Sequence, residues 1–523
     1  MNRHEPWQDT HDPAMPREEY AETSHLTAAI TMLLPALEQF LRFDTPEQTA
    51  RQRAVWEAQL DEPLPQTGAS AEAVLATLRD VVIPHGLRTG APGFSSFVLT
   101  MPTTVPTAAQ LAATISGPAA AWIHAYDTLE DLALRWLTEL LGLPSTYQGI
   151  FTGGGSTANL LGLGAARQYT AERLGVDPAY EGVAVLPQPR IYASTEVHHV
   201  VHRAAAVLGL GRSAVVTLPT DDATRLDMAV LRERVKHDRA AGCTPVAVVA
   251  SAGNVNTGAV DPLPEVAEFC RREHIWLHVD GAYGLFGILD PEVAALYGDL
   301  AAADSLAMDP HKWLAVPLGC GAAFVRDGKL LERAFTLQPA AYAEQSMPSH
   351  TDDAPLTSQF DDFGHYYIHL GVDQSAPCKG VQVWAVLKEI GVEGVRARIC
   401  RHNRYARHLA ERVQSSPTLE LMAPVTLSIC CFRYVPPALH GRTDKEATAL
   451  LNQLNQMVLT RVRARGRCVP SATIINGAFV IRPCYINPRT TLADVDALAD
   501  EVEFCGTEIW ATFDSKGEGQ TRG

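Results

Sequence analysis

The sequence lacks the cysteine patterns that mark a zinc site or a disulfide framework. None of its ten cysteines forms a pair with CxxC spacing, and most lie in apolar runs, where reduced cysteine behaves as a small hydrophobic residue. We therefore predict no disulfide scaffold and no metal site. Reduced cysteines favour a reducing compartment, so a cytoplasmic protein is expected.

Long apolar runs and an excess of basic residues are also missing. No apolar run is long enough to span a bilayer, and the segment Met1–Tyr20 is polar throughout, so neither a transmembrane helix nor a signal peptide is expected. The 523 residues carry a formal net charge of −16, which disfavours nucleic acids and anionic membranes as partners. With 46% hydrophobic residues, the chain can bury a large core, and its expected partner is a small molecule.

Between Gly149 and Val325, short β-branched runs alternate with runs of helical spacing. This alternation predicts βαβ units and a mostly parallel sheet that helices cover on both faces. Such sheets bind ligands at the C-terminal ends of their strands. The expected strands are Arg190–Ala193, Ser213–Thr217, Pro245–Ala250, Ile275–Val279 and Ala322–Val325, and the expected helices are Thr157–Tyr169, His198–Leu208, Met228–Ala240 and Leu263–Glu273.

The chain is predicted to have three parts. Residues 1–88 form an N-terminal helical segment, 89–385 a large α/β domain, and 386–523 a smaller α+β domain. A Gly- and Pro-rich stretch, Gly90–Pro106, predicts a loop that leads to a helix at Asp127–Leu143. The other expected helices are Leu26–Phe43, Ala71–Val82, Val381–Ile390, Val395–Gln414, Lys445–Arg465 and Leu492–Ile509. A strand is expected at Ala478–Ile481, and the run Leu427–Tyr434 is left without an assignment.

A glycine turn runs directly into a helix at Phe151–Leu160. The segment Gly153-Gly154-Gly155-Ser156-Thr157 places free N–H groups and two hydroxyls at a helix N-terminus, which suits a phosphate group. It matches neither the GxGxxG nor the Walker pattern, so nucleotides are disfavoured. An ordinary tight turn with a helix cap remains the alternative.

Asp280 stands where the apolar run Ile275–Val279 ends, at the functional edge of the predicted sheet. A carboxylate there can pair with a pyridinium nitrogen and keep it charged, although a cap or turn role is common for an aspartate in such a place. His198 follows another predicted strand and could stack on a planar ring and carry protons near neutral pH. For His199 and His202 a surface or capping role is preferred.

Lys312 lies in the otherwise apolar, turn-containing segment Asp304–Leu314. A buried amine loses its hydration, so its free base can attack a carbonyl and hold a cofactor as a Schiff base. For an isolated lysine, a surface turn is the better interpretation. A phosphate turn, a histidine, a strand-end aspartate and a lysine in this order are much more specific, because a phosphorylated pyridine aldehyde requires all four.

The motifs His278-Val279-Asp280-Gly281-Ala282 and Pro310-His311-Lys312-Trp313 closely resemble those of the pyridoxal-phosphate-dependent group II amino-acid decarboxylases. This family includes the aromatic-L-amino-acid, histidine and glutamate decarboxylases, and the resemblance runs from about Glu62 to Val502. It implies the fold type I architecture, with a mostly parallel seven-stranded sheet. It also implies a homodimer with the active site at the subunit interface.

The resemblance implies a role for each site residue. Lys312 would bind pyridoxal 5′-phosphate covalently, Asp280 would pair with the pyridine nitrogen, and His198 and Ala282 would pack on opposite ring faces. Gly155, Ser156 and His311 would hold the phosphate. The full cofactor-binding set implied is Gly154, Gly155, Ser156, Thr157, His198, Asp280, Ala282, Asp309, His311 and Lys312.

In Gln338-Pro339-Ala340-Ala341-Tyr342 the sequence resembles the family's mobile loop, whose tyrosine is thought to protonate the carbanion after CO2 leaves. Tyr342 is therefore a predicted catalytic residue with Lys312, His198 and Asp280. A surface tyrosine is the alternative. Relatives with phenylalanine at this point form aldehydes, so Tyr342 favours simple decarboxylation.

The sequence departs from the family at several places, among them the wall Pro92–Phe97, which is less aromatic than in the enzymes with aromatic substrates. Ala376-Pro377 replaces a usual Arg-Arg pair, and Asn254-Val255 replaces Thr-Thr, whose second threonine bonds the ring hydroxyl. Val255 cannot make that bond, although Asn254 or Asn256 could. Asp309 stands where asparagine is common and adds a negative charge near the expected phosphate.

The predicted function is decarboxylation of an L-amino acid to an amine and CO2 by a pyridoxal-phosphate-dependent carboxy-lyase. The alternatives are decarboxylation coupled to oxidative deamination, aldol cleavage, transamination, or a non-catalytic scaffold of the same fold. The substrate is left open. The side chains expected near it are Phe94, Phe97, Trp122, His124 and Tyr366, although aromatic residues near an active site often serve only core packing.

Overall fold

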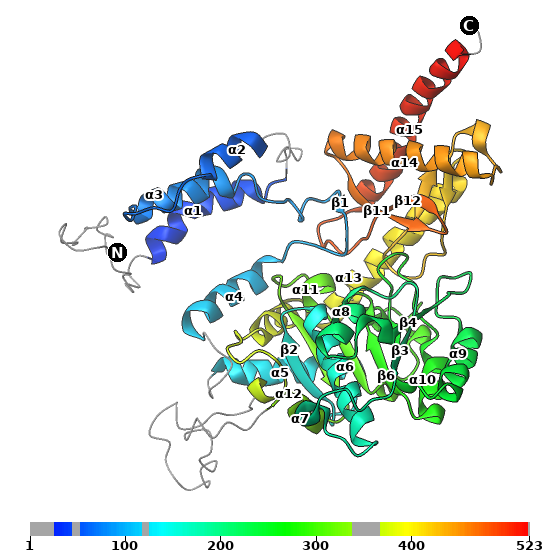
Figure 1. Cartoon of the computed structure of the whole chain (residues 1–523). Helices are drawn as coiled ribbons and strands as arrows, with labels where there is room; N and C mark the ends of the chain where they lie inside the picture. Colours follow the sequence, from blue (N-terminus) through cyan, green and yellow to red (C-terminus); the bar gives the residue numbers. More distant parts are fainter. Residues whose placement is uncertain (1–25, 44–52, 118–124, 337–366, 521–523) are drawn as a thin grey trace.

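The structure is a computed structural model that describes residues 26–43, 53–117, 125–336 and 367–520. It is built around a large mixed sheet with helices on both sides, joined to a smaller sheet and to a set of N-terminal helices (Figure 1). No described helix is both long and apolar enough to cross a membrane.

The large sheet has seven strands in the order β2-β8-β7-β6-β5-β3-β4. All neighbouring pairs are parallel except those of β8, which runs antiparallel to β2 and β7. The predicted fold class, a mostly parallel seven-stranded α/β sheet, is therefore confirmed. The strands are β2 (Gln148–Thr152), β3 (Pro189–Ser194), β4 (Val215–Leu218), β5 (Thr244–Ser251), β6 (Trp276–Asp280), β7 (Ser305–Met308) and β8 (Gly321–Val325).

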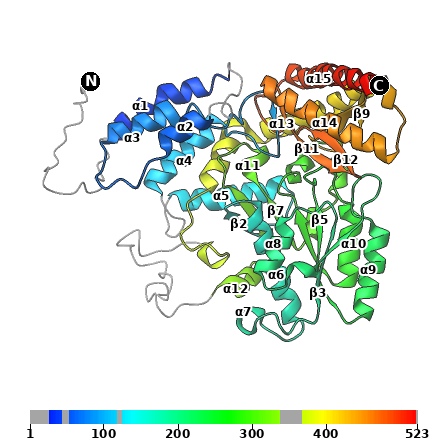
Figure 2. The same cartoon turned by 45° about the horizontal axis from the view of Figure 1, so that its top comes forward.

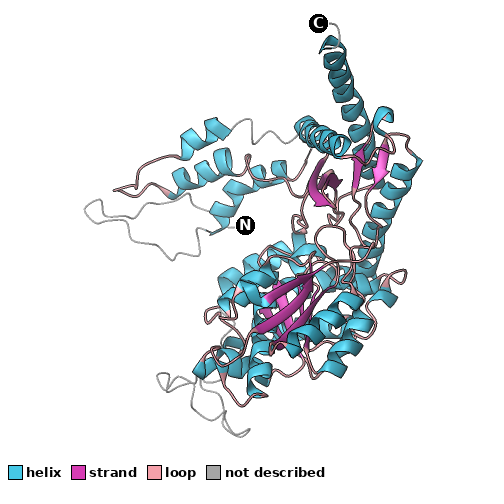
Figure 3. Ribbon diagram, turned by 45° about the vertical axis from the view of Figure 1, so that its right-hand side comes forward, coloured by secondary structure: helices cyan, strands magenta, loops and turns pink. Residues whose placement is uncertain are grey.

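The helices of this part pack against the sheet: α9 and α10 bury one side, whereas α6 is buried nearly all round. Helix α6 contacts strands β5 to β8, and α9 and α10 contact β5, which gives the layered arrangement in Figure 3. The bounds predicted for α9 and α10 agree with the structure. The helices are α5 (Ala125–Leu140), α6 (Gly155–Glu172), α7 (Pro178–Glu181), α8 (Val200–Val207), α9 (Met228–Ala240), α10 (Leu263–Glu273) and α12 (Lys329–Phe335).

Strands β2 and β7 were not predicted from sequence. β7 is only four residues long, Ser-Leu-Ala-Met, and contains no β-branched residue. β2 begins with Gln148-Gly149, and glycine is disfavoured in strands. Tertiary burial decides both cases, since every residue of β7 is buried within the sheet.

The C-terminal part combines a five-stranded sheet, in the order β1-β11-β12-β10-β9, with three helices (Figure 2). Helix α13 contains a non-helical Gly391 with φ of 64°, which agrees with the two separate helical runs predicted there. Within Leu427–Tyr434, which the sequence left without an assignment, the residues Phe432–Tyr434 form strand β10. The elements are α13 (Gly380–Ser415), α14 (Lys445–Arg465), α15 (Leu492–Gln520), β1 (Phe94–Ser95), β9 (Leu419–Leu421), β10 (Phe432–Tyr434), β11 (Val469–Ile475) and β12 (Ala478–Arg482).

The N-terminal helices are separated from the sheet domain in Figure 1. They are α1 (Leu26–Phe40), α2 (Arg53–Leu60) and α3 (Ala71–Thr77), which a π-helical turn at Leu78–Val82 extends. A further helix, α4 (Thr104–Ser116), was not predicted. Pro106 was interpreted as a loop signal, yet it lies in the first turn of α4, where proline is tolerated. The three-part domain division stays a prediction, and its boundary at residue 385 falls inside α13.

Candidate active site

A cavity of about 790 Å³ opens where strands β3, β5, β6 and β7 end. This is the edge of the sheet that the topology predicts for a ligand. Segments from the C-terminal sheet and the loop after β1 close its other side. Its lining includes Phe97, Val98, Gly153, Gly154, Gly155, Ser156, Thr157, Glu196, His198, Val255, Asn256, Asp280, Ala282, Asp309, His311, Lys312, Ser471, Ala472 and Arg482.

The glycine turn lies between β2 and α6 and forms one wall of this cavity. Gly154 has φ of 141°, a conformation that side chains rarely adopt, so glycine is required there. Gly154 precedes α6 without a side-chain cap, which leaves N–H groups of the first helical turn available to an anion. Ser156 is exposed and Thr157 half-buried, so both hydroxyls are also accessible from the cavity.

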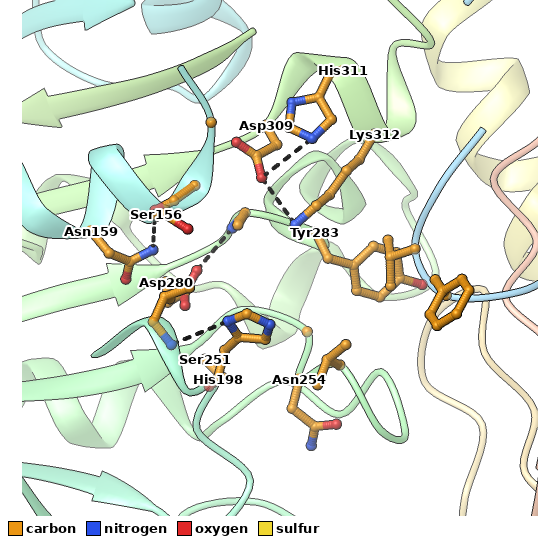
Figure 4. Close-up of a pocket in the computed structure, with 18 of the residues that line it drawn as sticks. Ser156, Asn159, His198, Ser251, Asn254, Asp280, Tyr283, Asp309, His311 and Lys312 are labelled. Atoms are coloured by element: carbon orange, nitrogen blue, oxygen red, sulfur yellow. Dashed lines mark hydrogen bonds and ion pairs between the residues drawn. The ribbon is translucent and has the colours of Figure 1, made fainter. Parts of the chain in front are cut away.

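Asp280 ends β6 and is 8% exposed. One of its carboxylate oxygens accepts a hydrogen bond from the Ala282 N–H at 3.1 Å, which fixes the carboxylate at the cavity wall (Figure 4). Its other oxygen can therefore accept a bond from a protonated ring nitrogen.

His198 lies in the loop that follows β3 and lines the cavity. Burial lowers the pKa of this imidazole, and the charge of the nearby Asp280 opposes that shift. The ring therefore lies in the cavity in its neutral form at neutral pH. A neutral, planar imidazole is suited to stacking on another ring.

Lys312 belongs to the short helix α11 (Pro310–Trp313), which follows β7. Its Nζ atom lies 2.9 Å from Oδ2 of Asp309, and Nε2 of His311 lies 3.9 Å from the same oxygen, as Figure 4 shows. His311 Nδ1 donates to the carbonyl of Cys320 at 2.9 Å, which directs Nε2 toward Asp309. Burial lowers the pKa of His311.

The chemical groups that line the cavity are of the types that pyridoxal phosphate requires. The cavity offers an anion site at a helix N-terminus, an amine, a strand-end carboxylate and a stacking imidazole. Within the described ranges, Oδ1 of Asp309 is buried and has no hydrogen-bond partner. This oxygen could accept a hydrogen bond from a bound molecule. The added negative charge of Asp309, which lies beside the glycine turn, opposes binding of a phosphate group.

A network of buried hydrogen bonds supports the cavity from behind. Asn159 Nδ2 donates to the Gly155 carbonyl at 2.8 Å, and Asn159 Oδ1 accepts from His278 Nε2 at 3.0 Å. His278 Nδ1 lies 2.8 Å from the Ser305 hydroxyl, which also accepts from Trp276 Nε1. Burial lowers the pKa of His278 to about 4, so a neutral ring joins α6, β6 and β7.

Arg482 is a cavity residue that the sequence reasoning missed. It ends β12, is 3% exposed, and donates to the carbonyls of Phe97 and Val255 and to the Ser471 hydroxyl. Its Nε atom is buried without a partner, and no carboxylate of the described ranges pairs with it. A charged residue directly after the apolar run Ala478–Ile481 was the signal that could have identified it.

The remaining predictions have varied outcomes. Phe97 lines the cavity and is 63% exposed, whereas Phe94 is buried and does not line it. Asn254 is bonded to Thr224 and Thr257, while Asn256 bonds Glu196 and Thr473. Tyr342, Trp122, His124 and Tyr366 lie outside the described residues.

The segment that replaces the Arg-Arg pair lies behind the glycine turn. Ala376 and Pro377 line a small cavity together with Thr157 and Glu130. Burial raises the pKa of Glu130 to about 8, which a hydrogen bond from the Gly380 N–H and the charge of Lys379 partly offset. The segment therefore retains one buried cation, Lys379, beside a buried acid.

Comparisons with known proteins give a consistent result. The family model described as the pyridoxal-dependent decarboxylase conserved domain matches residues 54–435. The aromatic-L-amino-acid decarboxylase of Bacillus atrophaeus is 31% identical over 454 residues, covering 85% of this chain and 88% of that protein. The L-2,4-diaminobutyrate decarboxylase of Rhizobium meliloti (strain 1021) is 28% identical over 460 residues, covering 86% and 84%. The crystal structure of mouse CSAD matches with a TM-score of 0.80 and 25% identity over 92% of this chain and 99% of that one.

Proposed function

This chain belongs to the pyridoxal-dependent decarboxylase family, and from that premise we propose which of its residues carry out the reaction. It is a carboxy-lyase that uses pyridoxal phosphate to convert an L-amino acid into the corresponding amine and CO2. The observation that carries the residue assignment is the convergence of Lys312, Asp280, His198 and the glycine turn on one cavity.

The first step is binding of the cofactor by the residues of the cavity. The N–H groups after Gly154 and the hydroxyls of Ser156 and Thr157 would hold the phosphate, with His311 beside them. Asp280 would accept a hydrogen bond from the protonated pyridine nitrogen and so keep that nitrogen charged. His198 and Ala282, which both line the cavity, would cover the faces of the ring.

Pyridoxal phosphate, once bound, supplies an electron sink for the bond electrons that departing CO2 leaves behind. Lys312, whose side chain lines the cavity, is the residue that would hold the cofactor covalently between turnovers. Tyr342, with His198 as the second candidate, delivers a proton to Cα of the product.

Arg482 orients the substrate by binding its carboxylate. The guanidinium is almost fully buried, lines the cavity and has no acidic partner in the part of the chain that the structure describes. A buried cation without a counter-ion favours an anion, and a planar guanidinium can hold a carboxylate in one orientation. Correct orientation of the scissile bond relative to the ring then favours loss of CO2.

The active unit is a homodimer with the cavity at its interface. Helix α1 buries none of its residues in the described chain. Four residues on one face of this segment, Ile30, Leu34, Leu37 and Leu41, are 37%, 45%, 42% and 45% exposed. Phe97 at the cavity is also exposed, so a second copy of the chain would bury apolar surface at both places.

All ten cysteines carry free thiols, and nine of them are buried. This supports a reducing, cytoplasmic setting for the enzyme.

A product analysis over standard, hydroxylated and diamino L-amino acids tests the reaction. We expect at least one substrate to release CO2 and its amine in equal amounts. Peroxide with an aldehyde in place of the amine would contradict simple decarboxylation.

A further inference from the structure

We propose that Asp309 is the counter-ion of Lys312 in the cofactor-free enzyme and that the same carboxylate weakens binding of the cofactor's phosphate. Binding of the cofactor then breaks the ion pair between Lys312 and Asp309. This inference rests on the roles proposed above for Lys312 and the glycine turn.

The ion pair is short and shielded from water. Lys312 Nζ lies 2.9 Å from Asp309 Oδ2, with side-chain exposures of 22% for the lysine and 2% for the aspartate. Charges in such an environment interact more strongly than at the surface, because little water screens them. Each charge therefore depends on the other while the cofactor is absent.

Besides Lys312, the one ionic neighbour of the Asp309 carboxylate among the described residues is His311, whose Nε2 lies 3.9 Å from Oδ2. Asp309 occupies the N-cap position of α11, yet its side chain makes no cap hydrogen bond. Its Oδ1 atom is buried and has no partner within the described residues. Asparagine would fill the same space without the charge, so packing alone does not explain why this position carries a carboxylate.

The same carboxylate lies against the glycine turn. A Cβ atom at Gly155 would come within 2.7 Å of Asp309 Oδ2, so glycine is needed for this close approach. Gly155 begins α6, whose N-terminus is the proposed phosphate site. Two negative groups, the carboxylate and the phosphate, therefore compete for one positive helix end.

Attachment of the cofactor removes the charge partner of Asp309. Lys312 must leave Asp309 and lose a proton to water before its nitrogen bonds the aldehyde carbon. One C=N bond then forms, and the aldehyde oxygen leaves as water. Asp309 remains next to the phosphate without the ammonium that balanced it.

The test is cofactor binding to cofactor-free enzyme, measured by fluorescence titration for Asp309→Asn and for the parent chain. We expect the variant to bind pyridoxal phosphate on the order of tenfold more tightly, since a like charge is removed from the site. We expect its affinity for pyridoxal, which lacks the phosphate, to rise much less. The cofactor-free variant should also melt at a lower temperature than the parent, because its Lys312 has lost its ion pair.

Asp304→Asn is the matched control. Asp304 precedes β7 at the end away from the cavity, where it accepts a hydrogen bond from the Leu277 N–H at 2.8 Å. This variant should lose stability without any change in cofactor affinity. Unchanged or weaker binding of pyridoxal phosphate by Asp309→Asn, or an equal gain for pyridoxal, would overturn the inference. Failure of Lys312 to bind the cofactor covalently would instead refute the proposed function.

Discussion

At the residue scale, the residues proposed to bind the cofactor and the arginine proposed to bind the substrate differ in how far the sequence reveals them. The cofactor-binding residues could be predicted, because Asp280 and His198 each follow a predicted strand and Lys312 lies in a compact sequence motif. The arginine could not. Arg482 comes from β12 and reaches Phe97, 385 residues away in the sequence, and nothing local in the sequence reveals that contact.

Arg482→Gln tests whether this arginine binds the substrate. If the guanidinium binds the substrate carboxylate, its loss removes a charged hydrogen bond of about 1.5–3 kcal/mol, so KM should rise roughly 10- to 100-fold. The absorption of the bound cofactor should be preserved. Steady-state kinetics with the best substrate provide the measurement.

Arg433→Gln is the control for this variant. Arg433 lies on the neighbouring strand β10 of the same sheet and pairs with Glu420 at 2.6 Å. Its replacement should leave KM unchanged. An Arg482→Gln enzyme with the parent KM would remove Arg482 from the substrate site.

At the scale of elements, the buried histidine His278 connects the parts that hold the cofactor. It bonds Asn159 on α6 and Ser305 on β7, and it lies on the same strand as Asp280. The sequence placed His278 in a family motif without assigning it a role, because its two partners are 119 and 27 residues away. Only the packed sheet brings these three elements together.

His278 gives the fold a defined acid sensitivity. Its pKa is about 4 in the folded protein and about 6.5 in an unfolded chain. The unfolded state therefore binds more protons between these values, so the stabilisation is complete above about pH 6.5 and is lost as the pH falls toward 4. Burial lowers the pKa of His198, His311 and His402 as well, which acts in the same direction.

The stability difference between His278→Gln and the parent should therefore become smaller as the pH falls, because the parent loses stability when His278 must gain a proton. Glutamine cannot gain a proton, so the variant lacks the acid-dependent loss at this position. Melting temperatures of both proteins between pH 7.5 and 4.5 provide the measurement. A stability difference that stays constant over this range would contradict a neutral, buried His278.

At the scale of the whole molecule, segments that are far apart in the sequence pair within one sheet. Strand β1 has only two residues and pairs with β11, with Phe94 opposite Val469. A Cβ atom at Gly93 would come within 2.0 Å of the Arg467 carbonyl, so the chain needs glycine at this contact. Such a short strand has no sequence signal, which explains why the Gly- and Pro-rich segment was predicted only as a loop.

The exposed apolar face of α1 leads to a prediction about assembly. The double variant Leu34→Glu, Leu37→Glu should be monomeric, because burial of two charges at the proposed interface is costly. Sedimentation velocity measures the mass, and Gln39→Glu on the same helix is the control that should stay dimeric. A parent chain that is monomeric and fully active would refute the proposed dimer.

The covalent attachment of the cofactor to Lys312 is the central claim, and borohydride reduction of the holoenzyme followed by peptide mass mapping tests it most directly. We expect one reduced pyridoxyl phosphate group, located on Lys312, and none after Lys312→Ala. A label on another lysine, or no label on a protein that binds the cofactor, would contradict the account.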